Sequence, residues 1–209
     1  MTYIKKKELE ILLEKVEPHP NPKPNLEQYT IPADVAAEIL FIASYTYDDI
    51  ICKRILDLGC GTGRLGIGAA LLGACEVVGV DLDVEAVRIA CKNAFNLGVS
   101  NKVIWVASDI SCVKGFFDTV LQNPPFGVQK RTADRSFLRK ALEVGSVVYS
   151  IHKSGDKNRH FIRWFVESLG GEISAVIPMK ISIPMQFKFH VRRKYVIDVD
   201  LYRIEVGKH

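Results

Sequence analysis

The chain lacks the long hydrophobic runs that a membrane protein needs. Its longest apolar stretches, such as Ile67 to Cys75, are far shorter than the roughly 20 residues that span a bilayer as a helix. The first eight residues contain three lysines and no apolar core of a secretory signal peptide. We therefore expect a soluble, cytoplasmic protein.

Cysteine is scarce and never clustered. The chain has five cysteines, and no two of them are closer than eight residues in the sequence. This spacing fits neither a disulfide framework nor a Cys-x-x-Cys zinc site, so no metal site is predicted. We expect reduced, mostly buried thiols at Cys52, Cys60, Cys75, Cys91 and Cys112.

The composition is that of a globular domain. Of the 209 residues, 48% are hydrophobic and 25% are charged, and a chain of this size buries most of its surface on folding. Apolar residues recur at helical spacing over Lys7–Glu17, and alternating prolines predict an extended connector over Pro18–Asn25. We expect one domain over residues 1–209, with this helix and connector in 1–31 and the core in 32–209.

The net charge of +4 is unevenly distributed. Residues 1–126 carry 12 basic and 16 acidic side chains, whereas residues 127–194 carry 14 basic and 5 acidic ones. Such an asymmetry is expected where one face of a protein meets phosphates. A solvated basic surface is the alternative that charge alone leaves open.

From residue 53 onward, short apolar segments alternate with segments of helical periodicity. This alternation predicts a Rossmann-like, doubly wound α/β fold, with a mostly parallel sheet covered on both faces. Ligands bind such sheets beyond the carboxyl ends of the strands. We expect strands at Arg54–Leu58, Glu76–Val80, Val103–Ala107, Thr119–Leu121 and Val147–Ile151, helices at Ala33–Thr46, Arg64–Leu72, Val84–Leu97, Phe137–Val144 and Asp156–Leu169, and a final antiparallel hairpin of Ile173–Ile183 and Tyr195–Val206 at one edge.

A glycine-rich turn follows the first of these strands. Its glycines let the backbone turn tightly and let a ligand approach main-chain atoms. Gly61 to Gly66 matches G-x-G-x-x-G, so a nicotinamide dinucleotide is one candidate ligand. The acidic residue and the additional glycine before this stretch favour S-adenosylmethionine, whose amino-acid end and sulfonium need a polar backbone. The predicted cofactor-binding residues of the turn are Asp57, Gly59, Gly61, Thr62 and Gly63.

Acidic residues also follow the next two strands. Asp81, followed by Leu82, stands where a carboxylate can accept hydrogen bonds from both hydroxyls of a ribose. Asp109 and Ile110 stand where an acceptor and an apolar side chain would meet the adenine of the cofactor. Asp83 is expected to cap the helix that follows it.

The fourth strand is followed by Asn123-Pro-Pro-Phe126. An amino group on an aromatic base is a poor nucleophile because its lone pair is delocalised. The side-chain oxygen of Asn123 and the carbonyl of Pro124 can accept both amino hydrogens while a methyl group arrives, and Phe126 can stack on the base. Pro125 extends the run of carbonyls without neighbouring N–H groups. Such catalysis depends on positioning and preorganised dipoles. A simple loop breaker is the alternative, which the location at a strand end disfavours.

With these motifs, the chain resembles class I S-adenosylmethionine-dependent methyltransferases of the amino-methylating branch. More narrowly, it resembles the archaeal and eukaryotic small-subunit rRNA adenine-N6 methyltransferases, the methyltransferase-like-five group, over nearly its whole length. The narrow markers are Gln28-Tyr29 and Tyr149 to Ser154. The resemblance implies S-adenosyl-L-methionine as cofactor, RNA as substrate and a seven-stranded sheet in the order 3-2-1-4-5-7-6 with strand 7 antiparallel.

The resemblance also implies roles outside these motifs. In this family a Gln-Tyr segment closes over the cofactor, which corresponds to Gln28 and Tyr29. The chain then has Thr30-Ile-Pro where relatives commonly have Pro-Thr, so the hydroxyl contact expected of Thr30 departs from the family pattern. Family members bind a small zinc-containing activator subunit at the third strand, here Val103–Val106, for which a simple capped edge strand is the alternative.

Basic residues between the last two strands are the best candidates for contact with RNA. They are interleaved with Phe187 and Phe189, a combination that suits phosphate binding and base stacking. Lys153, which follows His152, is placed to contact phosphate or to form a structural turn. The target adenosine would leave its stack to reach Asn123. The predicted RNA-binding residues are Lys153, Lys188, His190, Arg192, Arg193 and Lys194.

Other functions share part of this pattern. A guanine-N2 RNA methyltransferase also suits Asn-Pro-Pro-Phe. A glutamine-N5 protein methyltransferase usually carries tyrosine in place of Phe126, and the basic hairpin favours nucleic acid. The intact cofactor turn disfavours a non-catalytic scaffold. A nicotinamide oxidoreductase is disfavoured because the acidic residue and the additional glycine of the glycine-rich turn favour S-adenosylmethionine.

Overall fold

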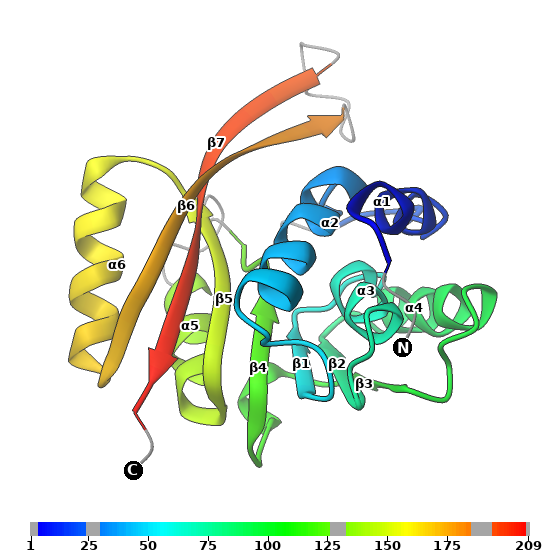
Figure 1. Cartoon of the computed structure of the whole chain (residues 1–209), viewed down its shortest axis with the longest axis horizontal. Helices are drawn as coiled ribbons and strands as arrows, with labels where there is room; N and C mark the ends of the chain where they lie inside the picture. The colour runs from blue at the N-terminus through cyan, green and yellow to red at the C-terminus, as the bar shows by residue number, and fades with distance from the viewer. Residues whose placement is uncertain (1–3, 24–29, 126–132, 185–193, 208–209) are drawn as a thin grey trace.

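The computed structural model describes residues 4–23, 30–125, 133–184 and 194–207 (Figure 1). Within these residues, a seven-stranded sheet has the order β3-β2-β1-β4-β5-β7-β6. β7 is antiparallel to both β5 and β6, and the other pairs are parallel. The predicted order and edge hairpin are therefore confirmed. The strands are β1 (Arg54–Leu58), β2 (Glu76–Asp81), β3 (Val103–Ala107), β4 (Phe117–Gln122), β5 (Gly145–Lys153), β6 (Gly171–Pro184) and β7 (Lys194–Val206).

Helices cover both faces of the sheet (Figure 1). One face carries α1 (Lys6–Glu14), α2 (Ala33–Phe41), α3 (Arg64–Leu71) and α4 (Val84–Asn96), and the opposite face carries α5 (Ala133–Val144) and α6 (Asp156–Ser168). A short 3-10 turn, η3 (Ile110–Cys112), follows β3. The helix predicted over Ala33–Thr46 consists of α2 and a π-helical turn, η2 (Ile42–Thr46).

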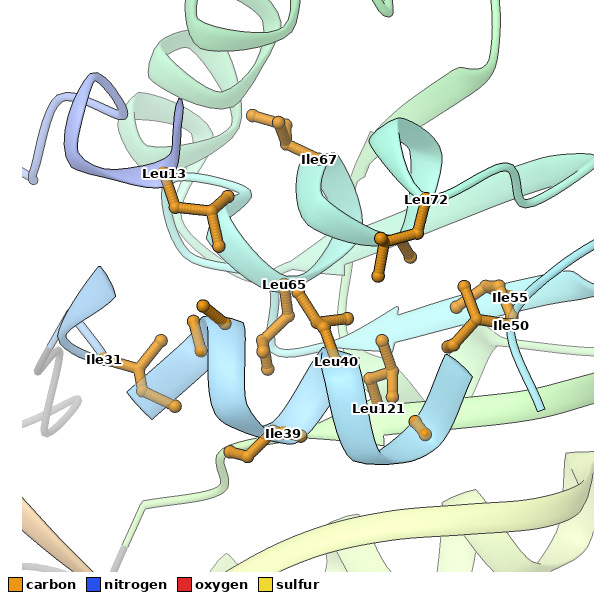
Figure 2. Packing of buried hydrophobic residues seen from close by; sticks show 14 of the residues in the cluster. Leu13, Ile31, Ile39, Leu40, Ile50, Ile55, Leu65, Ile67, Leu72 and Leu121 are labelled. Carbon is orange, nitrogen blue, oxygen red and sulfur yellow. The ribbon is translucent and has the colours of Figure 1, made fainter. Parts of the chain in front are cut away.

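The strand sequences explain the two cores. Successive side chains of a strand point to opposite faces, so Ile55 packs with the helices α1 to α3 while its neighbour Leu56 packs with α5 and α6. Leu121 and Val120 divide in the same way. Figure 2 shows the first cluster, in which Leu40 lies among residues of α3, β1 and β4. The apolar runs of the central strands are thus buried on both sides.

The amino-terminal segment is fastened to the start of α3. The guanidinium of Arg64 donates hydrogen bonds to the carbonyl oxygens of Ile31 (2.6 Å) and Val16 (2.8 Å). The side chain of Asn93 on α4 bonds both backbone groups of Glu17, at 3.0 and 3.1 Å. These bonds hold Val16, Glu17 and Ile31 close to the glycine-rich turn.

A buried polar cluster links the segment before β1 to the far strands. The Tyr149 hydroxyl donates a hydrogen bond of 2.6 Å to the Asp49 carboxylate, and Nε of Arg203 donates one of 2.8 Å to the same oxygen. The guanidinium of Arg203 also lies 4.4 Å from the ring centre of Tyr47. A buried charge needs such partners, and here they join β5 and β7 to the loop after η2.

Two expectations need correction. The thiols are free, but only Cys60 is buried, whereas Cys52, Cys75, Cys91 and Cys112 are exposed because they lie in turns or on outward-facing positions. The helix predicted from Phe137 begins four residues earlier, at Ala133. No helix in the described parts of the chain combines the length and apolarity needed to cross a membrane.

Candidate active site

A cleft of about 1110 Å³ opens beyond the carboxyl ends of the central strands. Its walls come from segments that are far apart in the sequence, because the parallel strands bring their following loops to one edge of the sheet. The described residues that line it include His19, Thr30, Asp57, Gly59, Gly61, Thr62, Asp81, Leu82, Asp109, Ile110, Asn123, Pro125, Arg135, Phe137, Arg139, Trp164 and Phe165.

The glycine-rich turn forms the floor of this cleft. Gly59, Gly61 and Gly63 have φ values of 74°, 53° and 87°, a region that favours glycine. At Gly63 a Cβ atom would stand 2.7 Å from the indole ring of Trp105, so side-chain bulk is excluded there as well. The backbone N–H groups of Gly59 and Cys60 both donate to the carbonyl of Val80. The turn is therefore fixed against β2.

The Asp57 carboxylate is enclosed beneath the turn. It is buried at the end of β1 and accepts a hydrogen bond of 2.7 Å from the backbone N–H of Gly66. Burial raises the pKa of Asp57 to about 7, the bond from Gly66 opposes this rise, and the negative charge of Asp81 adds to it. A positively charged ligand would relieve the cost of ionising this carboxylate.

Asp81 is the last residue of β2 and Asp83 precedes α4, and both carboxylates already accept hydrogen bonds. Asp81 accepts hydrogen bonds from the backbone N–H of Gly61 (2.8 Å) and of Asp83 (2.9 Å), and burial raises its pKa. Asp83 caps α4 by accepting from the N–H of Glu85 at 3.1 Å, which confirms the expected capping role. The neighbouring Leu82 is exposed and lines the cleft.

The proline-rich connector supplies a cleft residue that sequence reasoning missed. Nε2 of His19 lies 3.3 Å from the Asp83 carboxylate, and the imidazole is buried. Lys23 bonds the same carboxylate at 3.1 Å. A lone histidine in a connector gives no signal of this contact, because the partner stands 64 residues later in the chain.

Asp109 and Ile110 lie on the cleft wall after β3, as the motif predicts. The Asp109 side chain accepts a hydrogen bond of 2.8 Å from the N–H of Ser111 and so begins η3. Its second function, as an acceptor for a ligand, stays a prediction.

Asn123 follows β4 and faces the same cleft. Its side-chain oxygen Oδ1 is buried and accepts no hydrogen bond from any described residue. A buried acceptor without a donor costs free energy, and such an atom inside a ligand cleft is accounted for if a ligand donates to it. Pro124 is buried, and Pro125 lines the cleft beside Asn123.

A chain of hydrogen bonds lies behind this asparagine. The Gln122 side-chain amide donates to the Ser150 hydroxyl at 2.8 Å, and that oxygen lies 2.7 Å from Nε2 of His152. Burial lowers the pKa of His152 to about 4, so the imidazole is neutral. His152 and Lys153 are the last residues of β5 rather than residues after it, and only Lys153 is exposed. His152 therefore offers no surface cation to a phosphate.

The remaining predicted site residues divide into two groups. Thr30 lines the cleft, and Lys194 begins β7, at the base of the predicted basic loop. Gln28, Tyr29, Phe126, Lys188, His190, Arg192 and Arg193 lie outside the described residues.

The outer wall of the cleft was not predicted. It is formed by Arg135 and Arg139 of α5 with Trp164 and Phe165 of α6. The amphipathic pattern of these helices indicates which side chains are exposed, but it does not indicate that the exposed sides of two helices border the same cleft.

Comparison with known proteins identifies similar chains. Residues 33–145 match the family model described as "Methyltransferase small domain". The chain is 36% identical to the rRNA N6-adenosine-methyltransferase Mettl5 of Drosophila melanogaster, over 99% of both chains, and 35% identical to METTL5 of Danio rerio, over 96% of this chain and 98% of that one. A crystal structure of a candidate RNA methyltransferase from Pyrococcus horikoshii is 42% identical, with a TM-score of 0.91 over 99% of this chain and 100% of that one.

Proposed function

Since this chain belongs to the methyltransferase small domain family, together with the METTL5 rRNA N6-adenosine-methyltransferases, we propose that it methylates N6 of adenosine in RNA, with small-subunit rRNA as the substrate. The observation that carries the proposed reaction is the buried, unpartnered side-chain oxygen of Asn123 in the cleft.

The cleft suits S-adenosyl-L-methionine as cofactor. Its glycine-rich turn exposes backbone without Cβ atoms, and the buried Asp57 gains from a positively charged neighbour. When bound, the cofactor supplies an electrophilic methyl group on a sulfonium. Asp57 and the turn Gly59–Gly63 would hold its amino-acid part. Asp81 would accept hydrogen bonds from the ribose hydroxyls, Asp109 and Ile110 would border the adenine, and Gln28 and Tyr29 would close over the cofactor. Thr30 and Leu82, which line the cleft, would contact the cofactor as well.

The residues after β4 would position the target base. The Asn123 oxygen and the Pro124 carbonyl accept the two hydrogens of the adenine amino group, which draws electron density onto the nitrogen before transfer. Pro125 borders the base, and Phe126 stacks on it. The asparagine and proline acceptors carry no net charge, so catalysis depends on their fixed positions rather than on removal of a proton before attack. A volume of about 1110 Å³ exceeds the roughly 300–1,000 Å³ of a typical single-ligand pocket, which leaves room for cofactor and base together.

We extend the proposal to two partners. Exposed apolar side chains on the edge strand β3, Ile104 and Val106, suit a zinc-binding activator subunit that would cover this edge.

The basic residues Lys188, His190, Arg192, Arg193 and Lys194, with Lys153 at the end of β5, would bind RNA phosphates. Replacing Arg192, Arg193 and Lys194 by alanine should weaken RNA binding and reduce its salt dependence. Unchanged binding at low salt would exclude this loop as the phosphate site.

Nucleoside mass spectrometry tests the function. Small-subunit rRNA is incubated with the enzyme and methyl-labelled S-adenosylmethionine, with and without a candidate activator, and digested to nucleosides. Labelled N6-methyladenosine is the expected product. Label on guanosine would replace the adenine assignment by guanine-N2 methylation, and label on protein alone would exclude RNA as the substrate.

A further inference from the structure

The outer wall of the cleft carries an exposed aromatic side chain, Trp164. Trp164 is 62% exposed on α6, although tryptophan is one of the most apolar side chains. The other tryptophan of the chain, Trp105, packs against Gly63 of the cofactor turn and against Gly66 and Gly79. Trp164 therefore presents an indole to solvent at the border of the active-site cleft.

Neighbouring rings hold this indole in place. The centre of Trp164 lies 6.1 Å from that of Phe161 and 6.4 Å from that of Phe165. Phe161 and Phe165 are themselves stacked, with their centres 5.7 Å apart and their planes 19° from parallel. Such a cluster restricts the motion of Trp164 while part of its surface stays open.

Positive charge surrounds the cluster. The guanidinium of Arg135 lies 4.5 Å from the ring centre of Phe161, and that of Arg139 lies 5.6 Å from the ring centre of Phe165. Among the described residues, no carboxylate forms an ion pair with either arginine, whereas Arg54 and Arg159 each pair with one carboxylate and Arg203 pairs with two. The wall thus offers two guanidinium groups whose charge no described carboxylate neutralises.

The wall is continuous with the site of the reaction. Arg135, Arg139, Trp164 and Phe165 line the same cleft as Asn123. When the target adenosine of an RNA strand enters the cleft, the nucleotides on either side of it must pass over the edge of the cleft. An exposed ring beside arginines that no described carboxylate pairs with is the combination that binds single-stranded nucleic acid by stacking and phosphate contact.

We propose that this wall binds the RNA next to the target adenosine, with Trp164 stacking on an adjacent base and Arg135 and Arg139 contacting the flanking phosphates. The inference rests on the proposed methylation of RNA and names substrate-contact residues other than the basic residues predicted between β6 and β7. It needs no closure of the cleft and no contact with the cofactor.

Fluorescence titration reports on this contact directly, because Trp164 is the exposed one of two tryptophans. The full chain, saturated with S-adenosylhomocysteine, is titrated with a short single-stranded RNA that contains one adenosine among uridines. We expect RNA to quench the emission of the wild type, and Trp164→Phe to lose most of the quenching while still binding. Quenching that persists in Trp164→Phe would overturn the proposal.

Affinity and kinetics give the second readout. Trp164→Ala should weaken RNA binding about tenfold or more, the usual effect of losing one stacked base, and raise KM for RNA without changing cofactor affinity. Two further RNAs carry an abasic residue directly before or directly after the adenosine. The wild type should bind one of them more weakly than the intact RNA, whereas Trp164→Ala should bind all three equally. Phe95→Ala, at an exposed aromatic on α4, is the matched control and should leave both values unchanged.

The outcomes separate this inference from the proposed function. Quenching and affinity are measured without turnover, so a wild type that binds RNA through Trp164 but does not methylate adenosine would refute the function alone. A wild type that methylates RNA while Trp164→Ala keeps full affinity and KM would refute the wall alone. Emission that changes with protein concentration and not with RNA would assign the face to contact between copies of the chain and overturn the proposal.

Discussion

The side-chain amide of Gln122 donates a hydrogen bond of 2.8 Å to the hydroxyl of Ser150, and Gln122 directly precedes Asn123 in the chain. Since the amide already donates to this hydroxyl, the Ser150 proton is free to point towards Nε2 of His152, 2.7 Å away. The carboxyl ends of β4 and β5 are thereby joined behind the proposed acceptor. We infer that the bond fixes the direction in which Asn123 leaves the sheet.

Removing this hydroxyl should affect turnover more than cofactor binding. Ser150→Ala leaves the buried amide of Gln122 without its partner, which costs about 1–3 kcal/mol of unfolding free energy. We expect kcat to fall about tenfold through misplacement of Asn123. Denaturant unfolding and single-turnover kinetics measure the two effects. Ser146→Ala, on the same strand, is the control, and a Ser150→Ala enzyme of normal kcat would show that the bond has only a structural role.

His152 should make stability depend on pH. Its pKa falls from an ordinary value near 6.5 to about 4 because burial disfavours the charged imidazole. Between these values the unfolded chain binds a proton that the folded chain does not, so His152 lowers stability as the pH falls from about 6.5 to 4, by up to about 3 kcal/mol. Urea unfolding of the wild type and of His152→Gln measures this contribution as a difference.

The raised pKa of Asp57 makes the free energy of unfolding fall as the pH rises, opposite to the effect of His152. Since both proteins contain Asp57, this contribution cancels when the unfolding free energy of His152→Gln is subtracted from that of the wild type. A difference in unfolding free energy that stays constant from about pH 4 to pH 7 would show that His152 does not titrate in this way.

Asp57 should make cofactor affinity depend on pH. Its pKa of about 7 means that the carboxylate is protonated below neutrality in the ligand-free protein. If the positively charged cofactor binds the ionised form, affinity rises with pH up to about 7, by at most about tenfold per pH unit. Isothermal titration calorimetry across this range checks the prediction. In Asp57→Asn the affinity should be lower and nearly independent of pH, and an equal slope in both proteins would assign the dependence to another group.

The sequence predicted the fold closely because its signals are local. The apolar runs and helical periods of the core give strand and helix positions within a few residues, and a strand end followed by Asp57-x-Gly-x-Gly-x-Gly63 indicates both the ligand edge and the cofactor class. Parallel connectivity then places Asp81, Asp109 and Asn123 at the same edge.

The rest of the site depends on contacts between distant segments. His19 reaches Asp83 only because Arg64 and Asn93 hold the amino-terminal segment beside the turn. Trp164 borders the cleft because α5 and α6 pack side by side on one face of the sheet (Figure 1). The prediction that the thiols are mostly buried was wrong for the same reason, because the burial of a thiol depends on which face of its helix or strand meets the core.

The central claim is that the buried side-chain oxygen of Asn123 accepts a hydrogen bond from the amino group of the target adenine. Single-turnover methylation of RNA by Asn123→Ala, measured beside cofactor affinity, tests it most directly. We predict that the rate of methyl transfer falls by about 10²–10³ or more, as when one preorganised hydrogen-bonding group is removed from an active site, while cofactor affinity stays within a few-fold of the wild type. A variant that transfers the methyl group at the full rate would contradict the account.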